Sequence, residues 1–396
     1  MNNELDGWVP GEMTGLGSAP TEPVQQRLDL RFTGSGWEYF RIWAVNLALM
    51  VVTLGIYYPW ARVRKLRYVY ANTTIDGDAL TYHATGFQLF KGMLVAGLML
   101  GAINLLGVLA PGLAALSGLA FWLLLPWFWA SAMRFRLRQT SWRGVRFGFR
   151  GGVGGAYRAL GGGALLVSAC AVVLFFALTW AEGMGAGTLA MVVIALLGVG
   201  LLAAAASLMV LWLRRYQHNH YAFGSLTVSM NVSWGQVWRA SLAGMGVLGS
   251  LFVLFVLFGV LGLLGMALAE AREPVAVGVV IWVFGGFYLL FPLVSAYVSA
   301  RYQNLFWGAT QHPQLQVRSA LSPWRLVGVT LLNILLTALT LGLYWPFAMV
   351  RVLRLRLEAM SLESSVDWAT VRATATAGDN SLGDMAMDGQ GVDFGF

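Results

Sequence analysis

The chain alternates between long apolar runs and short polar segments along most of its 396 residues. Runs of about 20 residues, long enough to cross a hydrocarbon core as a helix, occur at Leu94–Ala110, Ala159–Ala181, Leu189–Leu213, Leu242–Ala269 and Val275–Ser299. A soluble protein can bury one such run in its core, but not this many. The pattern therefore predicts an all-α polytopic membrane protein.

An internal repeat is visible in the spacing of aromatic and basic residues. Each apolar segment is preceded by an aromatic residue and a base: Phe40-Arg41, Phe90-Lys91, Tyr157-Arg158, Trp238-Arg239 and Trp324-Arg325. Four segments also end on arginines, namely Arg67, Arg134, Arg215 and Arg301. The step from each arginine to the next base is always 24 residues (67 to 91, 134 to 158, 215 to 239, 301 to 325). We interpret these four equal connectors as one structural module used four times.

The interior of each connector has the pattern of a short β-hairpin, with β-prone runs on either side of a turn. The paired runs are Thr73–Ile75 with Ala79–Tyr82, Thr140–Trp142 with Val145–Phe149, and Tyr221–Phe223 with Leu226–Met230. The fourth connector is degraded and has His312-Pro313 in its turn region. Leu28–Phe32 and Ser365–Thr376 are candidates for half-units of the same sheet. The sequence thus predicts short β-hairpins between the helices.

The lengths of the apolar segments divide them into two kinds. The three central segments reach the roughly 40 residues that an out-and-back helical hairpin needs. They give six transmembrane helices near 92–110, 113–132, 159–181, 188–212, 241–268 and 275–299. The first and last segments are shorter and share a motif at an offset of 287: Asn46, Thr53–Ala61, Arg64 and Arg67 match Asn333, Thr340–Ala348, Arg351 and Arg354.

The shared motif favours two re-entrant helical hairpins, at 42–60 and 326–348. Gly55 and Gly342 can break a helix, and Pro59 and Pro346 suit the first turn of a new one. The alternative is eight transmembrane helices. That arrangement would put both termini and the basic residues after Pro346 in the periplasm, against the positive-inside rule.

One stretch of the chain resembles a known family. Within Phe32–Gly86, the resemblance rests on the Phe-x-Gly start, Tyr39–Asn46, Thr53–Ala61, Arg64, Arg67-Tyr68, Asn72-Thr73 and Asp76-Gly77. These resemble the YjgN-like bacterial inner-membrane proteins, a family built on a domain of unknown function, and the likeness extends over residues 28–360. The resemblance implies a location in the bacterial inner (cytoplasmic) membrane, and it carries over no catalytic or ligand residues. Arg62 and Lys65 lack basic counterparts at Met349 and Val352, so the second motif copy is less charged.

Composition and charge agree with a membrane protein: 58% of residues are hydrophobic, 11% are charged, and the formal net charge is +8. The bases flank apolar segments, which favours the lipid bilayer and anionic lipid headgroups as partners over nucleic acid. The four connectors carry fourteen Lys or Arg, whereas the opposite loops carry only Arg272. We therefore expect the connectors to be cytosolic. No protein partner is indicated.

Polar termini frame the membrane domain. Residues 1–26 form a polar lead-in without a signal peptide, expected to be disordered, and residues 27–360 form the integral membrane domain. Residues 361–377 include a possible cytosolic strand, and residues 378–396 form an acidic tail, also expected to be disordered.

Reactive chemistry is sparse. The interiors of the predicted spans contain no Asp, Glu, Lys or His, which usually mark sites at membrane depth. His218-x-His220 is the only His pair, at a helix exit where an interfacial role is favoured over a metal. Cys170 is the single cysteine and excludes an internal disulfide. We predict no catalytic residue, metal or cofactor, and we do not expect an enzyme.

The two short segments are the candidate functional centre. Their motif residues could line a pathway, as discontinuous helices do in transporters: Asn46, Thr53, Gly55, Pro59, Asn333, Thr340, Gly342 and Pro346. Alternatively, the Asn and Thr side chains only hold the helix break together. The arginines Arg64, Arg67, Arg351 and Arg354 are candidate contacts for an anion or a lipid headgroup. The leading hypothesis is a transporter or channel-like protein for a small solute or lipid. The alternative is a non-catalytic membrane scaffold that binds a cytosolic partner or a lipid surface through its hairpins.

Overall fold

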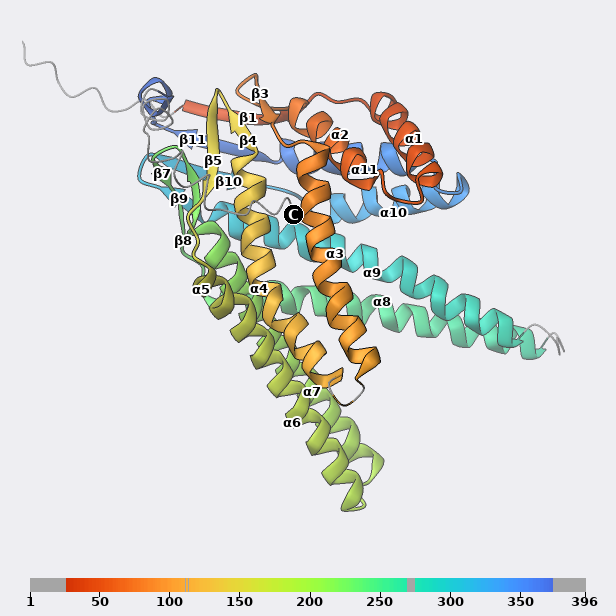
Figure 1. Cartoon of the computed structure of the whole chain (residues 1–396). Coiled ribbons are helices and arrows are strands. Elements are labelled where there is room, and N and C mark those ends of the chain that lie inside the picture. Colours follow the sequence, from red (N-terminus) through yellow and green to blue (C-terminus); the bar gives the residue numbers. More distant parts are fainter. Residues whose placement is uncertain (1–25, 111, 113, 269–274, 373–396) are drawn as a thin grey trace, which may run out of the picture.

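The structure is a computed structural model that describes residues 26–110, 112, 114–268 and 275–372. Within these residues the helices form five hairpins: α1 (Gly36–Val52) with α2 (Tyr58–Ala71), α3 (Gly86–Leu109) with α4 (Ala114–Arg138), α6 (Gly162–Gly183) with α7 (Thr188–His218), α8 (Trp234–Leu268) with α9 (Val275–Gly308), and α10 (Pro323–Leu339) with α11 (Trp345–Glu358). A short helix α5 (Val153–Ala156) and a π-helical turn η2 (Tyr157–Gly161) lead into α6. The hairpins leave the sheet and diverge from it (Figure 1).

The strands of the described residues form one antiparallel sheet of eleven strands. They are β1 (Gln26–Phe32), β2 (Thr73–Ile75), β3 (Asp78–Tyr82), β4 (Thr140–Trp142), β5 (Val145–Phe149), β6 (Tyr221–Phe223), β7 (Leu226–Thr227), β8 (Ser229–Met230), β9 (Thr310–His312), β10 (Leu315–Ser319) and β11 (Met360–Ser364). The first three connectors have strands at or near the predicted runs, with Leu226–Met230 divided between β7 and β8, and the fourth connector also forms a hairpin, of β9 and β10, for which no runs were predicted. The all-α fold class is nevertheless wrong, because the hairpins do not remain separate: they pair edge to edge into a single large sheet.

The sheet nearly closes on itself. Its order is β7-β6-β5-β4-β3-β2-β1-β11-β10-β9-β8, and the two end strands are consecutive pieces of chain separated only by Val228. β7 pairs with β6, while β8 pairs with β9. The terminal strands complete the circle, since β1 pairs with β2 on one side and with β11 on the other. The result is a nearly closed barrel. Its open edge lies between β7 and β8, which follow each other directly in the chain.

Tight turns hold the first two hairpins. Asp76 and Gly77 have φ of 53° and 83°, and Arg143 and Gly144 have φ of 49° and 81°. Positive φ at both central positions matches the turn type whose twist fits two-residue hairpins. Arg143 also forms ion pairs with Asp76 and Asp78, which join the turns of neighbouring hairpins.

The helices follow the same circular order as the strands. Each helical hairpin contacts the next around the ring, and α11 contacts α1. Each hairpin also starts and ends at the sheet, so the chain consists of strand–hairpin–strand units. The first segment also returns to the sheet: β1 and β2 flank α1 and α2 in the chain and are paired with each other. The helices of these two segments cover 36–71 and 323–358, beyond the predicted bounds of 42–60 and 326–348.

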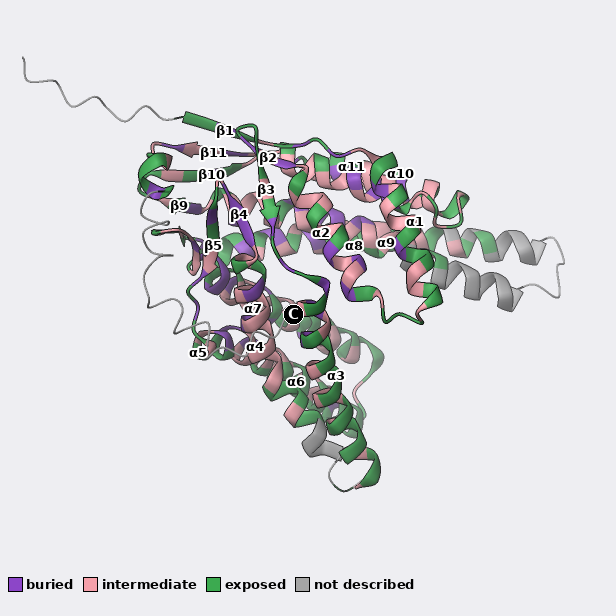
Figure 2. Cartoon of the chain, turned by 45° about the horizontal axis from the view of Figure 1, so that its top comes forward, coloured by how far each residue is buried: buried purple, intermediate pink, exposed green. Residues whose placement is uncertain are grey.

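Four helices of the described residues are long and apolar enough to cross a membrane, judged by length and composition: Gly86–Leu109, Val153–Gly183, Thr188–His218 and Trp234–Leu257. They coincide with four of the six predicted spans. The other two spans fall on α4 and α9, helices of 25 and 34 residues. Large apolar side chains such as Phe175, Phe176 and Leu197 are exposed on these helices. Figure 2 shows buried positions gathered where the helices meet the sheet and exposed positions along the outer helices.

The termini follow the expectations in part. β11 ends at Ser364, so the strand lies at the start of the stretch 361–377, and residues 368–372 are helical. The half-unit expected at Ser365–Thr376 is therefore shifted towards the amino terminus. The expectations for residues 1–26 and 378–396 lie outside the described residues, apart from Gln26, which begins β1.

Candidate functional site

In each short hairpin, one threonine lies at the end of the first helix. Thr53 Oγ1 donates to the Leu49 carbonyl at 2.7 Å and accepts from the Tyr57 N–H at 3.1 Å. Thr340 Oγ1 does the same with Leu336 and Tyr344, at 2.7 and 2.9 Å. Each hydroxyl thus ties the end of one helix to the start of the next.

Glycine and proline shape the turn that follows. Gly55 and Gly342 have φ of 88° and 93°, a region that L side chains rarely adopt. Pro59 and Pro346 lie in the first turn of α2 and α11 and are buried. These residues therefore have structural roles in both hairpins, as the motif predicts.

Buried asparagines hold the two helices of each hairpin together. Asn46 Nδ2 donates to the Ala61 carbonyl at 3.4 Å, and its Oδ1 accepts from Arg64 Nη1 at 3.3 Å. Asn333 makes the equivalent contacts with Ala348, at 3.4 Å, and Arg351, at 3.5 Å. Arg64 and Arg351 are thus bound within the chain, which agrees with the interpretation that the polar groups hold the helix break together.

The remaining candidate arginines bind backbone of the neighbouring unit. Arg67 Nη2 donates to the Ala84 carbonyl and Arg354 Nη2 to the Gly34 carbonyl, each at 2.8 Å. Arg215, one of the regularly spaced arginines, donates in the same way to Val232 at 2.8 Å. This contact of Arg215 was not predicted, although the regular spacing of the arginines could have indicated it.

The two short hairpins lie side by side although their motifs are 287 residues apart. α1 contacts α11, and the rings of Phe40 and Phe347 stack with centroids 5.7 Å apart. Closure of the ring brings the two motif copies together. Their environments nevertheless differ.

A basic cavity of about 630 Å³ is lined mostly by the first short hairpin, and Trp345 of α11 also contributes to its lining. Its lining includes the cations of Arg62, Lys65 and Arg136, together with Asn46, and contains no carboxylate. Four tyrosines also line it: Tyr39, Tyr58, Tyr70 and Tyr82. Asn333 is not among the lining residues. The second motif copy also lacks the charge, since Met349 and Val352 replace the bases at the corresponding positions of α11.

The electrostatics of Tyr82 reflect this cluster of cations. Burial raises the pKa of the Tyr82 phenol, with Tyr70 acting in the same direction, whereas Arg62, Arg136 and Arg67 oppose the rise. An anion in the cavity would meet the same positive field, which falls off slowly in a partly desolvated site. Sequence reasoning missed Arg136 and Tyr82, because the end of α4 and strand β3 reach this cavity only through tertiary packing against the first hairpin.

The histidine pair is divided between two environments. His218 is 1% exposed, and its Nδ1 lies 2.7 Å from Thr310 Oγ1. Thr310 Oγ1 donates to the Phe306 carbonyl, so the His218 ring is the donor towards Thr310. The structure thus places His218 in the interior rather than at an interface. Within the described residues, no group of three or more His, Cys, Asp or Glu is placed to hold a metal ion.

A family model for a bacterial protein of unknown function (DUF898) matches residues 27–389. The inner membrane protein YjgN of Salmonella typhimurium is 38% identical over 123 residues, 31% of each chain, and that of Escherichia coli O157:H7 is 39% identical over 120 residues, 30% of each chain. The aligned part spans about a third of the length of these curated relatives. No solved structure matches the chain significantly.

Proposed function

The chain belongs to the DUF898 family of bacterial proteins, and from this premise we propose that it is a multi-pass inner-membrane protein that binds and passes a small anionic solute or lipid headgroup. The binding site is the basic cavity beside α1 and α2. The proposed role is transport, with no enzymatic step.

The observation that carries the proposal is the charge of that cavity. Arg62, Lys65 and Arg136 line it without any carboxylate to neutralise them. Grouping three cations in a cleft is unfavourable unless solvent or a bound anion compensates their mutual repulsion. Guanidinium groups and an ammonium are the donors that carboxylates and phosphates prefer. The tyrosine hydroxyls and the amide of Asn46 supply further polar groups.

The position of the cavity supports passage as well as binding. It reaches from Tyr82 in β3 and Arg136 near the end of α4, on the sheet side, to Met50 and Tyr58 beside the hairpin turn. Leu54 and Leu341, at the tips of the two short hairpins, are 93% and 95% exposed. Apolar tips of this kind suit insertion into lipid, with the polar faces of the hairpins turned to other protein.

The topology forms part of the proposal. Six transmembrane helices cross the bacterial inner membrane, two re-entrant hairpins enter it from the cytosolic side, and the sheet with its basic connectors lies in the cytosol. The relatives are named as inner membrane proteins. The exposed arginines near the sheet lie at the height of anionic lipid headgroups.

Reconstitution tests the proposal. The full chain is placed in vesicles of phosphatidylethanolamine with a minority of phosphatidylglycerol, and two probes are followed. One is the uptake of inorganic phosphate, and the other is the transbilayer movement of fluorescent phosphatidylglycerol. Movement of one probe, reduced at least about tenfold by Arg62→Gln with Lys65→Gln, supports the proposal and identifies the source of the anion.

Two controls accompany this measurement. Arg325→Gln changes an exposed base at the start of α10, outside the cavity, and leaves the rate unchanged. Cysteines replacing Met50 or Lys65 in a Cys170→Ala background react with a membrane-impermeant thiol reagent. Absence of movement of both probes, together with full protection of these cysteines, would overturn the proposal and favour a membrane scaffold.

A further inference from the structure

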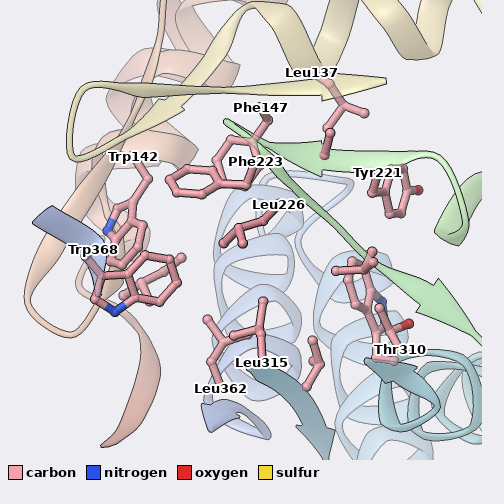
Figure 3. A pocket seen from close by; sticks show the side chains of 15 residues that line it. Leu137, Trp142, Phe147, Tyr221, Phe223, Leu226, Thr310, Leu315, Leu362 and Trp368 are labelled. Atoms are coloured by element: carbon pink, nitrogen blue, oxygen red, sulfur yellow. The ribbon is translucent and has the colours of Figure 1, made fainter. Parts of the chain in front are cut away.

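A second cavity, of about 370 Å³, lies inside the sheet. Figure 3 shows side chains from several strands projecting into this common space. Its lining is almost entirely apolar or aromatic and includes Trp142, Phe147, Phe223, Leu226, Leu315 and Leu362. Barrels of eight strands already hold one small ligand, and wider barrels leave more interior than side chains fill. An eleven-stranded, nearly closed sheet is wide enough for an internal ligand.

The cavity runs from the helix ends to the hairpin turns. Leu137 of α4 and Trp307 of α9 line its end near the helices. At the other end, the ring of Trp368 lies 5.0 Å from that of Trp142 and 6.0 Å from that of Phe223, between centroids. Trp142 and Phe223 are the last residues of β4 and β6 before their turns. Trp368 therefore covers the end of the barrel that faces away from the helices.

The polar side chains of the lining are Thr310, Tyr221 and three tryptophans, Trp142, Trp307 and Trp368. The hydroxyl of Thr310 is already used, because it donates to the Phe306 carbonyl and pairs with His218. The indole Nε1 atoms of Trp142 and Trp368 are buried and have no hydrogen-bond partner in the part of the chain that the structure describes. Buried N–H donors are normally satisfied, so two of them on adjacent rings indicate an acceptor from outside the chain.

We propose that the barrel binds a single-chain fatty acid, with the hydrocarbon chain in the cavity and a carboxyl oxygen accepting a hydrogen bond from the Trp142 or Trp368 indole. Apolar cavities stay dry and bind apolar ligands. The volume lies near the lower end of small-molecule pockets, about 300–1,000 Å³, which suits one hydrocarbon chain rather than the two of a phospholipid. The end towards the helices gives access from the membrane side. This inference is independent of the transport proposal, since no residue lines both cavities.

Photolabelling of the full chain in lipid nanodiscs tests the inference. The probe is palmitate with a diazirine in its hydrocarbon chain, and adducts are mapped by peptide mass spectrometry. The expected adducts lie on strands β4 to β6 and fall about tenfold or more with excess unlabelled palmitate. Adducts on the lipid-exposed residues Phe175 and Phe176 of α6 persist and serve as an internal control.

Variants sharpen the test. Leu226→Trp, which pairs with Phe223 on the face of the sheet that points into the cavity, fills the cavity and abolishes the sheet adducts, whereas Leu197→Trp, on the exposed face of α7, preserves them. Trp142→Phe keeps an aromatic ring but removes the N–H. If Trp142 is the donor, displacement of the probe from this variant should require about threefold to tenfold more palmitate than displacement from Trp368→Phe or from the unchanged chain. The reverse ranking assigns the donor to Trp368. Adducts confined to the lipid-facing helices, or sheet adducts that palmitate does not displace, would overturn the inference. Sheet adducts that persist in a folded Leu226→Trp variant would do the same.

Discussion

The guanidinium of Arg354 donates a hydrogen bond of 2.8 Å to the backbone carbonyl of Gly34, which lies 320 residues earlier in the chain. Arg67 and Arg215 make the same contact, at 2.8 Å, with the unit that follows each of them. Arg354 therefore connects the last unit to the first as its counterparts connect consecutive units. A closed ring of units explains why one contact appears at both short and very long sequence separation.

Loss of the Arg354 side chain should loosen this closure. We expect Arg354→Ala to lower Tm and to cost about 1 kcal/mol, since a charge-assisted hydrogen bond is lost from a partly exposed position. Thermal unfolding of the purified chain measures the effect. Arg325→Ala, an exposed base on α10, is the matched control. Equal Tm values for the two variants would contradict a role for Arg354 in closure.

The hairpin turns should not tolerate a side chain at their glycines. Gly55→Ala and Gly342→Ala place a Cβ at φ of 88° and 93°, and each should cost about 1–2 kcal/mol. Gly97→Ala, in the interior of α3 with open space around it, should be neutral or stabilising. Thermal unfolding compares the three. Neutral effects at both turns would show that the backbone there is not held at positive φ.

The buried histidine should be important for stability. His218→Ala removes the hydrogen bond to Thr310 and leaves a gap, at a cost of about 2–4 kcal/mol. His220→Ala, at a less buried position where the ring contacts the Tyr216 carbonyl, should cost less. Thermal unfolding with and without zinc measures both changes. If zinc raised Tm in the unchanged chain but not in His218→Ala, the alternative of a metal site would replace this structural role.

The paired terminal strands predict that both ends of the chain lie on one side of the membrane. β1 and β11 are adjacent in the sheet, and the positive-inside rule predicts that the sheet with its basic connectors lies in the cytosol. A reporter that is active only in the cytosol should therefore be active when it is fused to the carboxyl terminus. Activity of a reporter that works only in the periplasm would support eight full spans instead of two re-entrant hairpins.

Local patterns predicted much of this fold. The runs Thr140–Trp142 and Val145–Phe149 form β4 and β5 at the expected residues, because β-prone residues flank a turn with a glycine. The motif around Gly55 and Gly342 likewise predicted two helix breaks, since the glycine and the proline of each copy act on the backbone within a few residues. The equal connector spacing predicted that one module recurs.

Long-range pairing could not be predicted in the same way. The register between Leu28 and Leu362 joins the two ends of the chain, and no local signal specifies it. The all-α interpretation failed for this reason, because each hairpin is short and only their mutual pairing makes a sheet. Arg136 and Trp368 were missed as cavity residues on the same ground: each reaches its cavity only through packing against elements that are distant in the sequence.

Disulfide cross-linking tests closure of the ring most directly. Arg27 and Glu363 face each other across β1 and β11, and residues paired in this way have Cα atoms about 4.5–5.5 Å apart, within disulfide reach. Gln316 pairs with Glu363 from the other side, so it lies two strands, about 10 Å, from Arg27.

The measurement compares two cysteine pairs in a Cys170→Ala background after mild oxidation. A closed ring predicts an intramolecular disulfide between cysteines at 27 and 363, identified by peptide mass spectrometry, and little or none between 27 and 316. Absence of the first cross-link, or equal formation of both, would contradict the closed ring.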